Sequence, residues 1–166
     1  MLIPLALVTF LSFFLTYHYY FGPVYLFPSG FKKFPPHLVT SRYRDIGNWC
    51  RENLPEGSLV GIGEIGVIPY FGEFRVLDLF GLVDTHIARL PGGWNQKIDL
   101  GYLHERNPDY YILPEVKVGA GDNGEFVYKY VEVLKDDPNF VENYKVIRNW
   151  EDIHLYKRKD IPLGVN

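Results

Sequence analysis

The chain has 166 residues, of which 47% are apolar and 17% aromatic, so it is long enough for one domain with a hydrophobic core. Its net charge of −3 argues against a nucleic-acid partner, because phosphate binding requires clustered Lys and Arg side chains. Cys50 is the single cysteine, which excludes an internal disulfide and a thiolate metal cluster.

Residues 2–21 form the first predicted element and contain no Asp, Glu, Lys or Arg. At about 1.5 Å per residue, roughly 20 helical residues span the ~30 Å hydrocarbon layer of a membrane. Tyr17, Tyr19 and Tyr20 gather at one end, as in an interfacial aromatic belt. A signal peptide would need basic residues before the apolar run and a small-residue cleavage site after it. We therefore predict a retained transmembrane helix over residues 1–21.

Residues 22–39 are predicted to be a linker, because four prolines and two glycines forbid a continuous helix. The predicted soluble domain covers residues 40–166. Lys32 and Lys33 follow the apolar run and, read alone, predict a cytoplasmic domain. Helices upstream of this segment could reverse that topology.

The soluble domain alternates between helical and strand-like patterns. Helices are predicted at 41–54, 64–71, 84–90, 97–107, 126–135 and 138–144, strands at 58–63, 75–80 and 109–113, a loop at 118–124, and a hairpin at 145–150 and 153–157. Strands separated by helices imply a parallel sheet covered on both faces. The predicted fold class is α/β, with a mostly parallel sheet of about five strands, helices on both faces and a C-terminal antiparallel hairpin, preceded by the transmembrane helix.

The stretch LVGIGEIG, residues 59–66, has the G-x-G-x-x-G spacing of a dinucleotide-binding turn. That fingerprint needs a full helix after the turn, whose N-terminus carries the pyrophosphate. Pro69 follows Gly66 closely, and the next strand begins at Arg75, so the crossover is short. The glycines are better explained by a tight turn and a close approach of helix and sheet.

A longer signature begins in the same region, NWCRENLPEGSLVGIGEIGVIPYFGEFRVLDLFGLVD, and ends in D-x-x-G-L-x-D. Its key positions are Trp49, Pro55, Gly57, Gly66, Ile68, Tyr70, Asp78, Gly81, Leu82 and Asp84. This pattern resembles the C-terminal soluble domain of bacterial polytopic membrane glycosyltransferases of the GT-C type, such as protein mannosyltransferases and arabinofuranosyltransferases. The resemblance covers nearly all of residues 40–158. It implies transfer of a sugar from a polyprenyl-phosphate donor, with the catalytic acid in a membrane domain outside this chain.

Four residues are candidates for ligand binding. Asp78, Asp84 and His86 lie near the end of the second predicted strand, where ligands bind in open α/β sheets, and they could hold a metal or a hydroxylated sugar. The alternative is structural, with Asp78 bonded to loop backbone and Asp84 capping a helix. Trp94 lies on a Gly-rich loop and could stack on a sugar face or pack on the fold.

We therefore expect an accessory, non-catalytic domain of a membrane glycosyltransferase, as a fragment or split partner, on the extracytoplasmic side of the cytoplasmic membrane. The expected partners are the membrane, a polytopic transmembrane domain and a glycan or glycolipid acceptor. No catalytic residue, cofactor or metal is assigned. The alternatives are a stand-alone single-span glycan-binding or interaction protein and a nucleotide-binding oxidoreductase domain built on GIGEIG.

Overall fold

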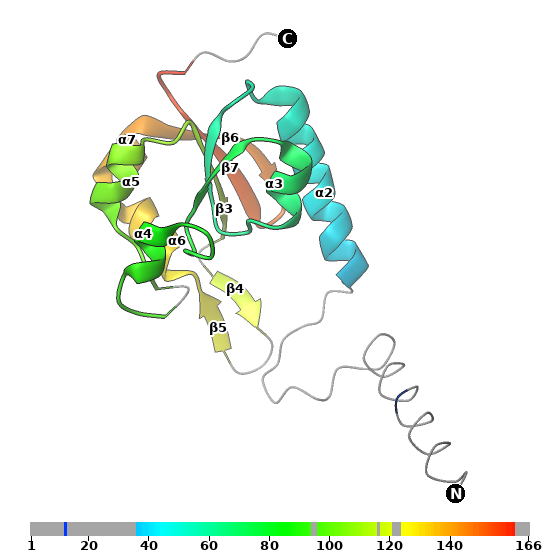
Figure 1. Cartoon of the computed structure of the whole chain (residues 1–166), viewed down its shortest axis with the longest axis horizontal. Coiled ribbons are helices and arrows are strands. Elements are labelled where there is room, and N and C mark those ends of the chain that lie inside the picture. Colours follow the sequence, from blue (N-terminus) through cyan, green and yellow to red (C-terminus); the bar gives the residue numbers. More distant parts are fainter. Residues whose placement is uncertain (1–11, 13–35, 94–95, 116, 121–123, 162–166) are drawn as a thin grey trace, which may run out of the picture.

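A computed structural model describes Ser12 and residues 36–93, 96–115, 117–120 and 124–161 (Figure 1). The elements follow in the order α2 (Pro36–Asn53), β1 (Leu59–Ile62), α3 (Val67–Gly72), β2 (Arg75–Asp78), α4 (Thr85–Arg89), α5 (Leu100–Arg106), β3 (Tyr110–Pro114), β4 (Lys117–Ala120), β5 (Gly124–Val127), α6 (Lys129–Asp136), α7 (Pro138–Asn143), β6 (Tyr144–Trp150) and β7 (Ile153–Arg158). Helix α2 begins at Pro36, four residues before the expected domain start, because proline is tolerated in the first turn of a helix.

One mixed sheet organises the domain, with strand order β2-β1-β3-β7-β6. β1 pairs in parallel with β2 and with β3, whereas β7 pairs antiparallel with both β3 and β6. The antiparallel pairings join more residues than the parallel ones. The prediction of a mostly parallel sheet is therefore wrong.

The reason lies in the chain after β3. Instead of crossing back through a helix to a parallel strand, residues 117–120 and 124–127 form a separate antiparallel hairpin, β4–β5. This hairpin occupies part of the predicted loop at 118–124 and the start of the predicted helix at 126–135. The chain re-enters the main sheet as the hairpin β6–β7, whose strands run antiparallel to each other, and β7 also pairs antiparallel with β3.

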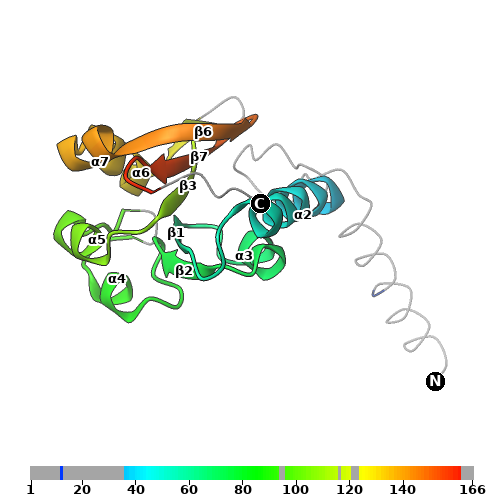
Figure 2. The ribbon, with the colours of Figure 1, turned by 90° about the horizontal axis from the view of Figure 1, so that it is seen from above.

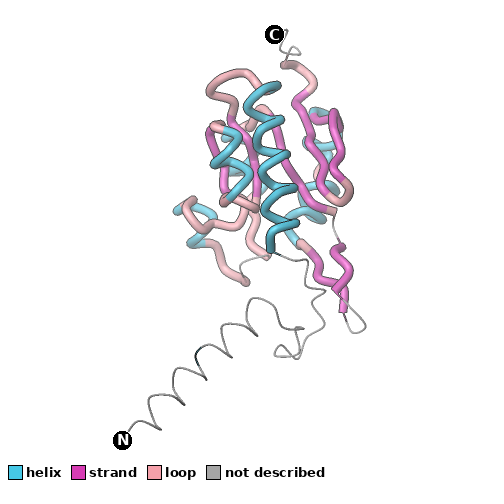
Figure 3. Tube along the Cα trace, turned by 90° about the vertical axis from the view of Figure 1, so that its right-hand side faces the viewer, coloured by secondary structure: helices cyan, strands magenta, loops and turns pink. Residues whose placement is uncertain are grey.

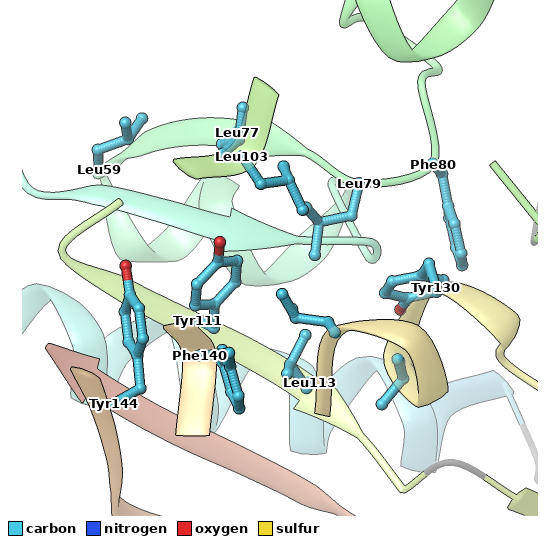
Figure 4. Close-up of a cluster of buried hydrophobic side chains, with 12 residues drawn as sticks. Leu59, Leu77, Leu79, Phe80, Leu103, Tyr111, Leu113, Tyr130, Phe140 and Tyr144 are labelled. Atoms are coloured by element: carbon cyan, nitrogen blue, oxygen red, sulfur yellow. The ribbon is translucent and has the colours of Figure 1, made fainter. Parts of the chain in front are cut away.

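Helices cover both faces of the sheet, so that the domain has three layers (Figures 2 and 3). Side chains from α2 and α3 pack with one face of the strands, in a cluster of Ile46, Cys50, Val60, Ile62, Ile68, Tyr110, Ile112, Ile153 and Leu155. On the other face, α5, α6 and α7 contribute to a cluster of Leu59, Leu77, Leu79, Phe80, Leu103, Tyr111, Leu113, Tyr130, Val131, Leu134, Phe140 and Tyr144 (Figure 4). The alternation along β3 sends Tyr110 and Ile112 to the first cluster and Tyr111 and Leu113 to the second.

No described helix corresponds to the predicted transmembrane helix. Among the residues that the structure describes, no helix is long and apolar enough to cross a membrane. The one helix of 18 residues, α2, carries charged side chains such as Arg44, Asp45 and Arg51. The segment expected to span the membrane, residues 1–21, lies outside the described residues apart from Ser12.

The three glycines of GIGEIG have different surroundings. A Cβ on Gly61 would collide with the ring of Tyr111, which packs edge-on against both Phe140 and Tyr144 (Figure 4). A Cβ on Gly63 would lie 2.7 Å from the Tyr130 hydroxyl oxygen. Nothing lies within 4 Å of the corresponding position on Gly66. The first two glycines therefore make room for aromatic rings on the face of the sheet that α5, α6 and α7 cover.

This packing predicts different costs for two alanine substitutions. Gly61→Ala should lower the free energy of unfolding by about 1–3 kcal/mol, because Tyr111 is 2% exposed and cannot swing into solvent. Gly66→Ala should change it by less than about 0.5 kcal/mol. Urea unfolding of the full chain measures both, and equal midpoints for the two variants would show that Tyr111 does not press on Gly61.

Candidate functional site

The connections of β1 create a crevice at one edge of the sheet. From β1 the chain crosses through α3 to β2, and from β2 it crosses through α4 and α5 to β3 on the other side of β1. The first crossover packs with the α2 face through Ile68, and the second packs on the opposite face through Leu103. The chain thus switches direction between β1 and β3. In open α/β sheets, ligands bind at such a switch point, outside the carboxyl ends of the strands.

A cavity of about 130 Å³ lies at this point, and we call it the switch-point cavity. Its lining residues come from α2, the ends of β1 and β3, α3, the segment before α6 and the β6–β7 turn: Arg42, Tyr43, Ile62, Gly63, Glu64, Ile68, Ile112, Pro114, Tyr128, Asp152 and Ile153. Five of these residues are aliphatic or proline, two are tyrosines and three carry charged groups. Small-molecule sites have this composition, with an apolar wall and a small number of orienting polar groups.

Arg42 fixes one wall of the switch-point cavity. Its Nη1 atom donates to Asp152 Oδ1 at 2.8 Å and to Glu151 Oε2 at 3.0 Å, which ties α2 to the β6–β7 turn. Burial works against the charge of the guanidinium, but Asp152 and Glu151 outweigh it and raise the pKa of Arg42. The Nε atom of Arg42 is buried and has no hydrogen-bond partner among the described residues. This cation is therefore already neutralised by two carboxylates.

Glu64 follows β1 directly and also lines the switch-point cavity. Within the described part of the chain, its carboxylate has no hydrogen bond and no ion pair. Burial raises the pKa of Glu64, because an unpaired carboxylate is poorly solvated there. Burial, reinforced by the charge of Glu64, also raises the pKa of Tyr43 and raises the pKa of Tyr128 to about 12. Both tyrosines therefore keep their protons at neutral pH.

Tyr130 lies under the loop that carries Glu64. Its ring is 1% exposed and packs edge-on against Phe80, with ring centroids 5.1 Å apart (Figure 4). Its hydroxyl group approaches Gly63 and has no hydrogen-bond partner in the described structure. Burial raises the pKa of Tyr130 well above its usual range. A buried hydroxyl without a partner is uncommon and costs stability.

Asp78, the first predicted site residue, is buried inside the fold. Asp78 is 1% exposed, and its carboxylate accepts hydrogen bonds of 2.7–3.4 Å from the backbone N–H groups of Phe80, Gly81, Val83 and Asp84. These hydrogen bonds fold the loop after β2 around the carboxylate. Gly81 in this loop has φ +73°, a conformation that favours glycine.

Asp84 is half-buried and His86 is exposed, and of the two only the backbone N–H of Asp84 bonds to the Asp78 carboxylate. Asp84 caps α4 by accepting from the His86 and Ile87 N–H groups, and it also accepts from the Tyr102 hydroxyl at 2.8 Å. The His86 ring stacks on Tyr102 at 4.1 Å, and its Nε2 atom lies 2.8 Å from Asp99 Oδ2. The hydrogen bonds from Ile87 N–H and Tyr102 outweigh burial and lower the pKa of Asp84. Each polar group in this cluster has a structural partner.

Trp94, the fourth predicted residue, lies outside the described residues. Among the residues that are described, no group of three or more His, Cys, Asp or Glu side chains could hold a metal ion. Sequence reasoning missed the switch-point cavity, because its polar residues Arg42, Tyr128 and Asp152 are far apart in the chain. The available signal was Glu64, a charged residue directly after a buried strand.

Because the Asp78 carboxylate holds the loop after β2, replacing it with an amide should clearly lower the stability of the protein. Asp78→Asn should lower the free energy of unfolding by about 1.5–3 kcal/mol, since an amide nitrogen would replace one acceptor of the loop N–H groups. Asp136→Asn, at an exposed position on α6, is the matched control and should change it by less than about 0.5 kcal/mol. Thermal unfolding of the full chain at pH 7 compares them, and equal melting temperatures would contradict the loop-folding role.

The Tyr130 hydroxyl has no hydrogen-bond partner among the described residues, whereas the Tyr144 hydroxyl has one. Removing each hydroxyl should therefore change the free energy of unfolding in opposite directions. Tyr130→Phe should leave the free energy of unfolding unchanged or raise it by up to about 1 kcal/mol, because it removes a buried polar atom without a partner. Tyr144→Phe should lower it by about 1 kcal/mol, because the Tyr144 hydroxyl donates to the Pro108 carbonyl at 2.6 Å. Chemical denaturation measures both, and a loss of stability in Tyr130→Phe would reveal a partner for that hydroxyl.

Comparison with known proteins gives a family but no activity. A family model described as "Domain of unknown function (DUF8728)" matches residues 37–163. No curated protein and no solved structure matches the chain. The assignment as a glycosyltransferase and the polyprenyl-phosphate donor, which the sequence resemblance implied, therefore find no support in these comparisons. Because the family model matches more than half of the sequence, the chain belongs to the DUF8728 family.

Proposed function

We propose that this domain is a non-catalytic glycan-binding module whose switch-point cavity takes one sugar ring of a larger glycan or glycolipid. The observation that carries the proposal is the cavity itself, which lies at the carboxyl ends of β1 and β3 and combines aromatic, aliphatic and charged side chains. The proposal assigns no catalytic residue to this chain.

The size and the lining of the cavity support a ligand of one ring. Its volume of about 130 Å³ is close to that of a cavity that holds a single benzene ring, roughly 150 Å³. Tyr43 and Tyr128 both line this space and contribute apolar ring surface to its wall. The carboxylates of Glu64 and Asp152 can accept from sugar hydroxyl groups.

The sequence resemblance to C-terminal domains of GT-C membrane glycosyltransferases supports an accessory role on the acceptor side. In that role the domain would lie outside the cytoplasmic membrane, beside a polytopic transmembrane partner, and would hold a glycan or glycolipid acceptor. A stand-alone glycan-binding protein would use the same cavity, so the binding test below applies to both settings.

The nucleotide-binding alternative has less support. A pyrophosphate at the GIGEIG turn would meet the carboxylate of Glu64, with Asp152 on the same cavity and Arg42 already paired. Helix α3, which would carry the pyrophosphate on its N-terminus, has only six residues. Both features disfavour a ligand with several negative charges.

A substitution in the cavity wall tests the proposal. Tyr128→Leu keeps apolar bulk but removes the ring face and the hydroxyl, and it should raise the Kd for a bound sugar about three- to tenfold. Tyr70→Leu is the matched control, because Tyr70 is 78% exposed on α3 and does not line the cavity. Calorimetric titration of the full chain with methyl glycosides of glucose, galactose and mannose measures the Kd.

The proposal fails if none of these sugars binds, or if the two tyrosine variants weaken binding equally.

A further inference from the structure

We propose that the ligand of the switch-point cavity carries a positively charged amino group, which pairs with the carboxylate of Glu64. This inference rests on the proposed function, because it names the class of sugar that the cavity takes: an amino sugar with a free ammonium group. It follows from the carboxylate of Glu64, the charged group of the cavity wall to which the described residues supply no partner.

The acidic side chains around the switch-point cavity differ in the hydrogen-bond and ion-pair partners of their carboxylates. Asp152 pairs with Arg42, and Glu151 on the same turn pairs with the same guanidinium. Asp78, at the end of the neighbouring strand, is satisfied by backbone N–H groups. Glu64 alone among these four has neither a hydrogen bond nor an ion pair within the described residues. Its carboxylate is partly buried and lines open space.

An unpaired and poorly solvated carboxylate has a high free energy, which a bound cation can lower. Arg42 is the cation of the cavity wall, but its Nη1 atom is held by two other carboxylates at 2.8 and 3.0 Å. The protein therefore supplies no counter-ion to Glu64 in the described structure. A ligand with an ammonium group would supply the missing charge and up to three hydrogen-bond donors.

The aromatic lining favours the same ligand class. Tyr43 and Tyr128 line the cavity with Glu64, and the charge of Glu64 raises the pKa of both hydroxyl groups, as expected for neighbouring groups. Tyrosine ring faces attract cations, and this attraction strengthens where water is excluded. The Tyr43 ring already carries the Arg42 guanidinium, with Cζ 5.7 Å from the ring centroid, and the Tyr128 ring stacks on Phe80. The unpaired charge of Glu64, more than the rings, therefore selects an ammonium group over a neutral hydroxyl or a phosphate.

The test compares ligands that differ in a single substituent. The full chain is titrated at low salt with the methyl glycosides of glucosamine, N-acetylglucosamine and glucose. The glucosamine glycoside should bind at least about tenfold more tightly than the other two, because only it carries an ammonium group. Cyclohexylamine, a six-membered ring with an amine and no hydroxyl groups, is the fourth ligand.

Two variants locate the effect. Glu64→Gln keeps the size of the side chain and removes its charge, so the glucosamine preference should fall to less than about twofold. Glu105→Gln removes the same charge from an exposed position on α5, away from the cavity, and should leave the preference intact. Circular dichroism of both variants verifies that they remain folded.

The outcomes separate this inference from the proposed function. Equal binding of glucose and glucosamine glycosides, unchanged in Glu64→Gln, would overturn the ammonium inference and leave glycan binding in place. Binding of cyclohexylamine that depends on Glu64, without binding of any glycoside, would support the ammonium site and overturn the glycan proposal. If none of the four ligands binds, both are wrong.

Discussion

The parallel pairing of β1 with strands on both of its sides is the constraint on which the rest of the structure depends. Parallel neighbours require crossovers: one leads from β1 through α3 to β2, the other from β2 through α4 and α5 to β3, and the two pack on opposite faces of the sheet. The crevice between the carboxyl ends of β1 and β3 is the geometric result. On the other face of the sheet, Gly61 and Gly63 leave space for the rings of Tyr111 and Tyr130, which do not line the cavity.

Local sequence patterns predicted the strands of the main sheet and most of the helices, because hydrophobic periodicity and breakers such as Pro55 act over a few residues. The direction of the sheet was not predictable in this way. It depends on the pairing of β7 with β3, which lie some 40 residues apart in the chain and have no local signal for their partner. The hairpin β4–β5 was missed because its glycine-rich stretch reads as a loop.

The candidate site shows the same division between local and distant interactions. The structural alternative for Asp84 rested on its place before a helix, and the structure shows that cap. Asp78 bonds to the backbone of the loop that follows it, which is also a local interaction. The switch-point cavity, in contrast, combines Arg42 from α2 with Asp152 from a turn 110 residues later. Only the tertiary fold brings these side chains together, so no spacing in the sequence indicates them.

Charge decides what the switch-point cavity can accept. The GIGEIG turn resembles a phosphate cradle in its glycines, but such cradles work by presenting unpaired N–H groups and positive potential to an anion. Here the one guanidinium is held by two carboxylates, and the turn itself contributes Glu64 to the cavity wall. The same backbone geometry that would suit a pyrophosphate therefore presents a negative group. A site of this kind favours neutral or cationic ligands, which is the physical reason to seek its partner among sugars and amines rather than among nucleotides.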